Sequence, residues 1–588
     1  MKTKLIIFLF SVFYISLFSN NVIIDGFINL ENETDFSGVF IQFNRTIPNP
    51  LEYTDTTDKN GYFNITIEEG IYSITIMKEG YIPQILEEQM FYFDTTYSTI
   101  TLETIGLSGQ LNGVLVSDVY NVGGDIEVNI DDTLIIMEGT ILKFCENVKF
   151  NINGLLIANG SETDSIIFTA NNISKPWTGI KFSSSSNNNS CLSFCKVSYC
   201  DDGAIEINNS GPSISNSTIS YNYFYSDGQE SGAAGIHLIN SNSIIKKVEI
   251  YNNELKYISY FSSYYHRGAG GVACRGGSPT LINLSIHNNT SEDDCCGAGG
   301  IVCNDNSQLT LTNCIIYSNI GRYGGGLGCQ TSGLKIYNST IVKNNAISGG
   351  GIYISVSDPE IINSIITENM ASSSGHEIYF GCSVSTTPNP SIQFCNFGLL
   401  EDSDVAAESS CGETIPYFLQ NITTNINGDN CDPYYNIALS PDFIDITNDD
   451  FELDSNSPCI DAGSNSYITI DYDYNYNIRI WQGNIDSIVD IGAYEYNSVP
   501  YTNIENAITQ NIELFKVFPN PFSEYMTLDH IKSDIKQIDF CNIQGGSIFS
   551  YKNLDEFNNT NFGFLTPGIY IIKLETNYAI LHKKVIKK

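Results

Sequence analysis

Residues 326–344 read GLGCQTSGLKIYNSTIVKN, and residues 351–369 read GIYISVSDPEIINSIITEN. Each stretch begins with a glycine and two apolar residues two positions apart, and ends in a seven-residue frame with Asn, Ile and Asn at its first, fourth and last positions. The apolar pair occurs seven times between residues 203 and 380. Steps of about 25 to 36 residues with period-two apolar pairs are typical of stacked β-coils, which bury alternate side chains against the next coil. The sequence therefore predicts a parallel β-solenoid.

The spacing between these landmarks shows where the coils can vary. From the first apolar residue of a pair to the next Asn frame the distance is 11 residues in five copies and 12 in one. From the end of a frame to the next glycine it varies from 7 to 18 residues. Core segments cannot change length without breaking the ladder, whereas backbone that faces water tolerates insertions. The insertions are therefore expected on one edge of the solenoid.

The repeated Asn and Cys residues are explained by the coil itself. Stacked Asn side chains can hydrogen-bond along a ladder, so N-x-S/T triplets such as residues 338–340 are interpreted as structural and not as glycosylation acceptors. Cys274, Cys303 and Cys329 occupy equivalent positions, where parallel thiols about 4.8 Å apart pack well but bridge awkwardly, so we expect free thiols. The better disulfide candidates, in a less regular stretch, are Cys382, Cys395, Cys411 and Cys431.

Residues 1–20 have the pattern of a secretory signal peptide, with Lys2 and Lys4 before an apolar run at residues 5–18. The run is too short for a comfortable membrane span, and 16 Cys fit an oxidising compartment. The formal net charge of −38 argues against nucleic acid or anionic lipid as a partner, because both need a cationic surface. We expect an extracellular protein, either secreted or held at the outer-membrane surface.

Residues 21–105 alternate apolar and polar residues in short runs, the pattern of a small β-sandwich. Turn residues stand in TDKNGYF at residues 57–63, GIY at 70–72 and KEGY at 78–81. Together these motifs resemble the carboxypeptidase regulatory-like domain, a transthyretin-like β-sandwich. The resemblance implies an accessory spacer or binding module without catalytic residues.

Residues 106–440 are expected to form the solenoid, with GTILKF at residues 139–144, GLLIANG at 154–160 and WTGI at 177–180 in its first coils. These segments resemble the right-handed β-helix family of pectate-lyase-like proteins. That fold hosts lyases, hydrolases, adhesins and inert spacers, so the resemblance implies a fold and not an activity. The expected fold is all-β, a right-handed parallel β-helix flanked by two small β-sandwich domains.

Residues 441–497 carry SPCIDAG at residues 457–463 and VDIGAYE at 489–495. The pair resembles the choice-of-anchor region that closes many bacterial surface β-helices, and DYDYN at residues 471–475 replaces the usual glycine-bearing turn. Alternating Asp residues suit either a cap of hydrogen-bonded carboxylates or a Ca²⁺ site at the C-terminal end of the solenoid. The expected cofactor is either none or calcium, whose candidate ligands are Asp461, Asp471, Asp473 and Asp490.

After a linker at residues 498–512, residues 513–588 carry FPNPF at 518–522, TPGIYIIK at 566–573 and a basic end. The alternation between these signals predicts a small β-sandwich. The set resembles the type A C-terminal sorting domain of the type IX secretion system. The resemblance implies export by that machinery in a Bacteroidetes-type bacterium, with removal of the domain and release or outer-membrane surface attachment of the rest.

Titratable and aromatic residues gather in the variable edge loops. Because these loops leave the same corner of successive coils, we expect them to stack into one lobe beside a groove. Aromatic rings are platforms for sugars, and paired acid and base groups are what glycoside hydrolysis or lyase chemistry needs. The expected ligand-binding residues are Tyr257, Tyr260, Tyr264, Tyr265 and Arg267. The catalytic candidates are Asp227, Glu230, His266, Arg267, Asp293 and Asp294.

The sequence does not fix the chemistry of this lobe. No family signature places a catalytic Asp pair, a Lys or Arg base or Ca²⁺ ligands on a defined strand. The favoured interpretation is a carbohydrate-binding or adhesive and structural surface protein, with a polysaccharide or surface glycan as partner. The alternative is a polysaccharide lyase or glycoside hydrolase acting in the groove. The tyrosines of residues 254–267 could also fold back and close a satellite core.

Overall fold

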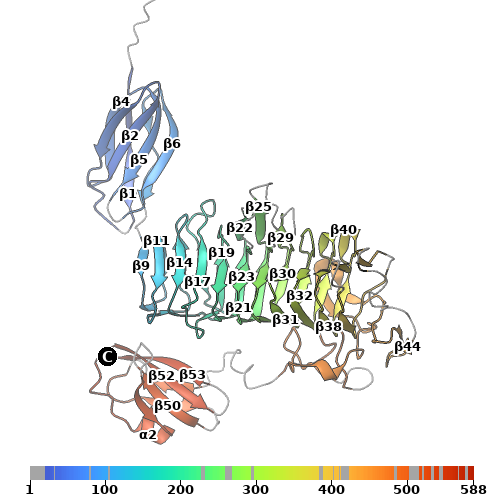
Figure 1. Cartoon of the computed structure of the whole chain (residues 1–588). Coiled ribbons are helices and arrows are strands. Elements are labelled where there is room, and N and C mark those ends of the chain that lie inside the picture. Colours follow the sequence, from blue (N-terminus) through green and yellow to red (C-terminus); the bar gives the residue numbers. More distant parts are fainter. Residues whose placement is uncertain are drawn as a thin grey trace, which may run out of the picture. The chain divides into compact units, whose positions relative to one another are not determined.

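The computed structural model of the 588-residue chain is almost entirely β (Figure 1). It describes residues 20–31, 33–78, 81–102, 106–226, 232–257, 268–292, 297–382, 388–400, 403–408, 411, 423–481, 487–501, 515–519, 522–530, 535–541, 547–566, 568–576 and 580–588. Two compact units are distinguished, residues 1–107 and residues 108–588. The predicted all-β fold is confirmed. No helix in the described ranges is long and apolar enough to cross a membrane.

The N-terminal unit is a two-sheet β-sandwich. One sheet contains β1 (Asn21–Leu30), β4 (Tyr62–Glu68), β7 (Thr95–Thr96) and β8 (Ile100–Leu102). The other runs in the order β3 (Leu51–Thr56), β2 (Phe40–Ile47), β5 (Gly70–Met77) and β6 (Gln84–Phe91). Alternate residues such as Ile24, Phe43 and Tyr72 fill the core. Gly61, at φ +81°, is required in the turn before β4, because a Cβ there would lie 2.2 Å from the Ile28 carbonyl oxygen.

The solenoid consists of three parallel ladders, which we name A, B and C. Ladder A contains the end of β11 (Val119–Val128), β14 (Lys149–Ile152), β17 (Gly179–Phe182), β20 (Ile205–Asn208), β23 (Ile236–Ile239), β26 (Val272–Arg275), β30 (Ile301–Asn304), β33 (Leu327–Gln330), β37 (Ile352–Ser355), β41 (Ile378–Gly381) and β43 (Val405–Ala407). An additional strand, β9 (Leu107–Gln110), pairs with β11.

Ladder B contains β10 (Gly113–Leu115), β12 (Thr133–Ile136), β15 (Leu155–Asn159), β18 (Cys191–Ser193), the first halves of β21 (Ser213–Ser220) and β24 (Ile244–Tyr251), β27 (Thr280–Ile282), β31 (Gln308–Thr312), β34 (Gly333–Tyr337), β38 (Glu360–Ile362) and β42 (Ser391–Gln393). Ladder C contains the start of β11, β13 (Ile141–Phe144), β16 (Ile166–Ala170), β19 (Cys195–Ser198), the second halves of β21 and β24, β28 (Ser285–His287), β32 (Ile315–Tyr317), β35 (Thr340–Val342) and β39 (Ile365–Thr367).

The two corners of each coil use the Asn frame in different ways. The first frame residue lies between ladders B and C with φ near +50°, a left-handed conformation that Asn tolerates better than most residues. The last frame residue is buried, and its side-chain amide donates to the Asn of the next coil over 2.8 to 3.0 Å. This predicted ladder runs from Asn222 to Asn369, whose amide donates to Glu377 Oε2 over 2.6 Å.

Cys274, Cys303 and Cys329 of ladder A are not disulfide-bonded, as predicted. Cys274, Cys303 and Cys329 are buried in register on successive coils. Of the four disulfide candidates, Cys382 and Cys411 form a bridge, whereas the prediction is wrong for Cys395 and Cys431. Cys395 fills a core position with its thiol against the carbonyl oxygens of Ile361 and Gln393, and Cys431 packs in an apolar cluster.

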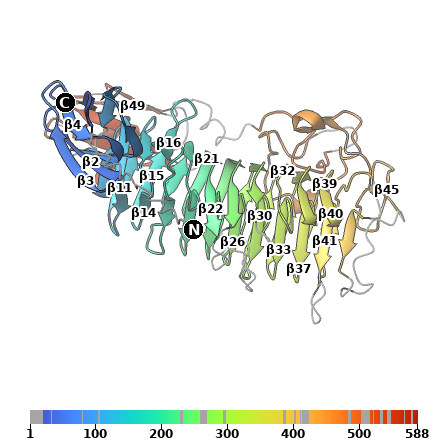
Figure 2. The ribbon, with the colours of Figure 1, turned by 90° about the horizontal axis from the view of Figure 1, so that it is seen from above.

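The closing region, residues 441–501, packs along the side of the solenoid, not over its end (Figure 2). Its elements are β46 (Phe443–Asp445), η2 (Ile446–Asn448), β47 (Asp450–Leu453) and η3 (Asn465–Tyr467), and a preceding hairpin joins β44 (Thr423–Thr424) to β45 (Asn430–Cys431). The first-frame Asn residues hold it, because Asn283 donates to the Asp473 and Tyr474 carbonyl oxygens and Asn363 to the Ser464 carbonyl oxygen.

The C-terminal domain is a separate small β-fold. β48 (Phe515–Phe518) pairs with β49 (Thr527–His530). A four-stranded antiparallel sheet runs in the order β51 (Ser547–Tyr551), β50 (Ile535–Cys541), β52 (Gly568–Thr576) and β53 (Ile580–Lys587), and α2 (Leu554–Asn558) lies between β51 and β52 in the chain. Phe522, Phe540 and Phe562 form its aromatic core.

Candidate functional site

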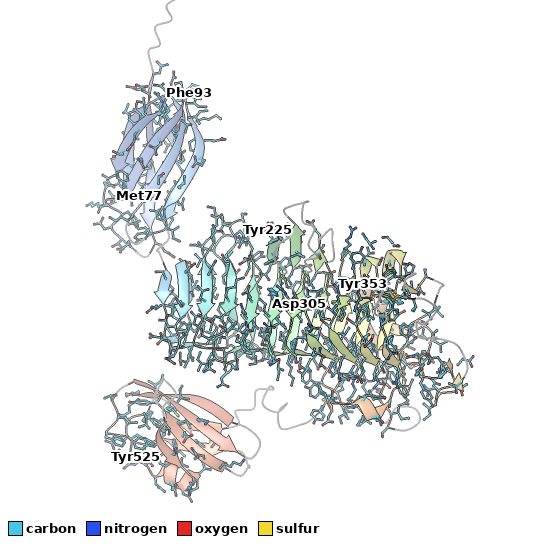
Figure 3. The ribbon with its side chains drawn as sticks, in the orientation of Figure 1. Met77, Phe93, Tyr225, Asp305, Tyr353 and Tyr525 are labelled. Atoms are coloured by element: carbon cyan, nitrogen blue, oxygen red, sulfur yellow. A yellow bond between two sulfur atoms is a disulfide. The ribbon has the colours of Figure 1, made fainter. Side chains whose placement is uncertain are left out.

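The variable loops stack into a small parallel sheet beside the coils, which we name the arm. The arm contains β22 (Tyr223–Ser226), β25 (Glu254–Tyr257), β29 (Thr290–Ser291), the bridge residue Ile320, β36 (Asn345–Ser348) and β40 (Met370–Ser374). Phe224 and Leu255 point inward and are buried, whereas Tyr225 is exposed (Figure 3). The expected stacking of the edge loops is therefore observed in the described parts of these loops.

The outer parts of these loops lie outside the described residues. Tyr257 ends β25, and its neighbour Lys256 forms an ion pair of 3.0 Å with Glu254 and lies 4.4 Å from the Tyr223 ring centroid. The remaining lobe residues, all outside the described ranges, are Asp227, Glu230, Tyr260, Tyr264, Tyr265, His266, Arg267, Asp293 and Asp294. Their proposed binding and catalytic roles stay predictions.

Charged residues on the outer face of ladder A, in the coils from β17 to β26, are paired with one another. Lys181 Nζ lies 3.1 Å from Asp202 Oδ2 and 3.9 Å from Glu206 Oε2. Arg275 Nε lies 2.9 Å from Asp305 Oδ2. Because these carboxylates already have cationic partners, they are poorly placed to serve as free acid and base groups.

His237 occupies the same outer face but is almost completely buried. Burial, with the positive charges of Arg275 and Lys181 nearby, lowers the pKa of His237 to about 3. The imidazole is therefore neutral at ordinary pH and has no proton to give as a general acid. Sequence reasoning had not singled out this residue, whose signal is a histidine between the two apolar positions of β23.

A column of tyrosines lies further along ladder A. Tyr353 and Tyr379 are outward residues of β37 and β41 in register, with ring centroids 5.5 Å apart and planes within 7° (Figure 3). The Tyr323 ring, from the preceding coil, lies 5.0 Å from that of Tyr353, and the Arg322 guanidinium lies 5.8 Å from the Tyr323 ring. These rings are only partly buried. Sequence reasoning missed them, although a Tyr between two apolar residues of a strand points outward by period two.

The closing region contains a group of buried charged residues. Arg479 is fully buried, and its Nη2 donates to Asn313 Oδ1 over 2.7 Å and to the Gly492 and Ala493 carbonyl oxygens. Its Nη1 lies 3.8 Å from Glu495 Oε2. Burial raises the pKa of Glu495 to about 10 and that of Asp490 to about 7. The Arg479 guanidinium thus lies among several carboxyl groups whose raised pKa values favour the protonated form.

The carboxylates of three candidate calcium ligands accept hydrogen bonds from different groups of the protein. Asp490 accepts the backbone N–H groups of Asp461 and Tyr496, and Asp473 accepts those of Asn477 and Glu495. Asp471 is exposed and accepts from the Tyr501 hydroxyl over 3.4 Å. No cluster of His, Cys, Asp and Glu with the arrangement of a metal site is found in the described ranges. The geometry supports the hydrogen-bonded alternative, at the side of the solenoid, and calcium binding stays a prediction.

Comparison with known families matches two parts of the chain. Residues 232–397 match the right handed beta helix region family, and residues 516–588 match the secretion system C-terminal sorting domain. A search of curated proteins found no match.

Solved structures show distant similarity. An interface mutant of a type II cohesin–X–dockerin complex from Acetivibrio cellulolyticus is 22% identical with a TM-score of 0.12, and the match covers 14% of this chain and 58% of that one. The Bacillus anthracis TIE protein is 13% identical with a TM-score of 0.13 over 19% of each chain. Pectate lyase Pel9A is 13% identical with a TM-score of 0.28, over 66% of this chain and 89% of that chain. These similarities carry no inference about activity.

Proposed function

We propose that this chain, a right-handed parallel β-helix protein exported through its type IX sorting domain, binds saccharides at the cell surface or in the medium. The binding surface is the tyrosine column of ladder A, Tyr323, Tyr353 and Tyr379, beside the arm. The described part of the arm adds the exposed Tyr225 on the same edge of the coils.

The observation that carries the proposal is the alignment of three partly exposed tyrosine rings on successive coils. Tyrosine combines an apolar ring, which packs against sugar C–H groups, with a hydroxyl that hydrogen-bonds sugar oxygens. Coils about 4.8 Å apart repeat this pair of contacts along one line. Such a line suits an extended chain of sugar units more than a compact small molecule.

The enzymatic alternative receives less support from the described residues. Asp202 and Asp305 are paired with Lys181 and Arg275, and His237 is buried. A lyase or hydrolase needs one group that gives a proton and another that takes one or attacks, both free to reach the sugar. Incubation with polysaccharides should therefore release no unsaturated ends and no reducing sugar.

The proposal is tested by replacing Tyr353 and Tyr379 together by Ala and measuring retention in native gels that contain neutral polysaccharides. Loss of the two rings should weaken retention about tenfold, or by about 1.4 kcal/mol. Tyr434→Ala removes a more exposed tyrosine, 50%, from another part of the described surface and should change nothing. Retention of the double variant equal to that of the wild type would contradict the proposal.

A further inference from the structure

We infer that a second row of aromatic rings, on ladder C, binds neutral polysaccharide chains, so that one molecule can link two chains. We name it the tyrosine row, and its members are Tyr199, Tyr221, Tyr251, His287 and Tyr317. The inference rests on the proposed function, because it assigns a second surface to the same class of ligand.

The row is continuous over five coils. Ring centroids of Tyr199 and Tyr221 lie 5.9 Å apart, and those of Tyr221 and Tyr251 lie 5.6 Å apart. His287 is sandwiched between Tyr251 at 5.1 Å and Tyr317 at 4.6 Å, with planes within 12°. Each ring comes from the next coil, so the solenoid fixes the spacing of the row without support from the arm.

One end of the row is buried against the closing region, and the other end is accessible to solvent. The Tyr317 ring lies 5.2 Å from that of Phe451, and both pack in the cluster that joins the closing region to ladder C. His287 is 8% exposed, whereas Tyr221 is 43% exposed. An interface with the closing region explains the buried end only. The other end, the half-buried Tyr199 and the exposed Tyr221, extends the same row over coils whose ladder C face carries no described part of that region (Figure 2).

The surroundings of the open end select a neutral polymer. Ser198 and Thr218, both half-buried, carry small hydroxyl side chains on the outer face of ladder C, beside the buried Ser220. Charged groups of opposite sign lie beside the row, because the exposed Lys196 is in register with Thr218 and Thr218 with Glu249, which pairs with His287 Nε2 at 3.2 Å. A chain of formal net charge −38 repels uronic acid polymers, so stacking on the rings and hydrogen bonding to hydroxyl groups favour an uncharged polysaccharide.

The two aromatic surfaces lie on different ladders, on the two sides of the arm. Tyr221 lies two residues before β22, the first arm strand, whereas Tyr353 and Tyr379 are in ladder A strands. A polymer bound along one surface therefore leaves the other free for a second polymer. Two moderate sites of this kind raise the overall retention by more than either site alone.

The test compares four proteins in native gels containing hydroxyethyl cellulose or polygalacturonate: the wild type, Tyr199→Ala/Tyr221→Ala, Tyr353→Ala/Tyr379→Ala and the variant with all four changes. Each pair should weaken retention by hydroxyethyl cellulose about tenfold, and the fourfold variant should lose it. Polygalacturonate should retain none of them. Tyr199→Phe/Tyr221→Phe keeps both rings and should retain most of the binding, and an unchanged Tm shows that the coils are intact.

The outcomes separate the two claims. If the row variant binds like the wild type while the ladder A variant does not, the row is only part of the docking interface and the inference is overturned. If the ladder A variant binds like the wild type while the row variant is weakened, the proposed site on ladder A fails and the row stands. Light scattering of hydroxyethyl cellulose solutions should rise with the wild type and with neither paired Ala variant. Scattering that persists in both would overturn linkage through these two surfaces.

Discussion

Asn residues occupy two corners of each coil for two physical reasons. At the first frame position a backbone in the left-handed region is needed, and at the last a buried amide must be both donor and acceptor. Lys247 replaces Asn at a first frame position and keeps φ at +54°. The Lys247 ammonium lies 5.0 Å from the Tyr476 ring centroid. The residue that departs from the Asn frame therefore contacts the closing region.

Glu377 ends the Asn ladder and should make the stability of the solenoid depend on pH. It is 4% exposed, and burial raises its pKa to about 8, from about 4.3 in an unfolded chain. The stability contributed by the protonated form is complete below pH of about 4.3 and is lost as pH rises through about 8. Glu377→Gln does not titrate, so its Tm relative to that of the wild type should increase between pH 5 and pH 8.5.

Glu368→Gln is the matched control, since Glu368 is an exposed carboxylate in the same coil turn. Its Tm should stay close to the wild-type curve, because the Glu368 charge is the smallest of the causes that raise the pKa of Glu377. Parallel curves for Glu377→Gln and the wild type would show that Glu377 is ionised in the folded protein over the whole range.

The sequence predicts the repeating residues better than the exceptions. The Asn residues of the ladder and the buried cysteines of ladder A could be predicted from the sequence, because each recurs at a fixed step. Glu377 could not, because it accepts from Asn369 where a further ladder Asn would stand, and no repeat of the frame marks it. Gly351 is the equivalent position one coil earlier. A Cβ there would lie 2.6 Å from the Glu377 carbonyl oxygen and 2.9 Å from the Asn369 amide nitrogen, so a side chain such as that of Glu377 does not fit at Gly351.

At the scale of elements, the arm and the closing region differ in how far local pattern determines them. The arm follows from loop lengths, which place insertions at one corner. The closing region docks through pairs such as Asn283 with Asp473, 190 residues apart. No local period marks such contacts, so its place along the side of the coils could not be predicted from sequence motifs.

The closing region should be insensitive to calcium. Both carboxylate oxygens of Asp473 and of Asp490 accept backbone N–H groups, so they already have partners in the folded chain. The Tm should therefore be the same with chelator and with excess calcium. A rise in Tm with calcium would instead support the predicted site at Asp461, Asp471, Asp473 and Asp490, because a bound cation stabilises only the folded state.

At the scale of the whole molecule, the C-terminal domain has its own aromatic core. Truncation after residue 512 should leave the Tm of the solenoid unchanged and should strand the protein in the periplasm, because the sorting domain match is confined to residues 516–588. Protease accessibility on intact cells measures the location. A truncated protein that reaches the surface would show that the transport address lies elsewhere.

The amide ladder also has a direction. Each Asn from Asn222 onward donates to the residue one coil further along the chain, and Glu377 takes the last donor. The chain is synthesised from its N-terminus. Until residue 377 has been made, the last complete coil therefore has a buried Asn amide without its acceptor on the next coil. Such an orphan donor costs about 1–3 kcal/mol. Growth of the solenoid is thus vectorial, with every new turn completing the one before it and a carboxyl group as the terminator.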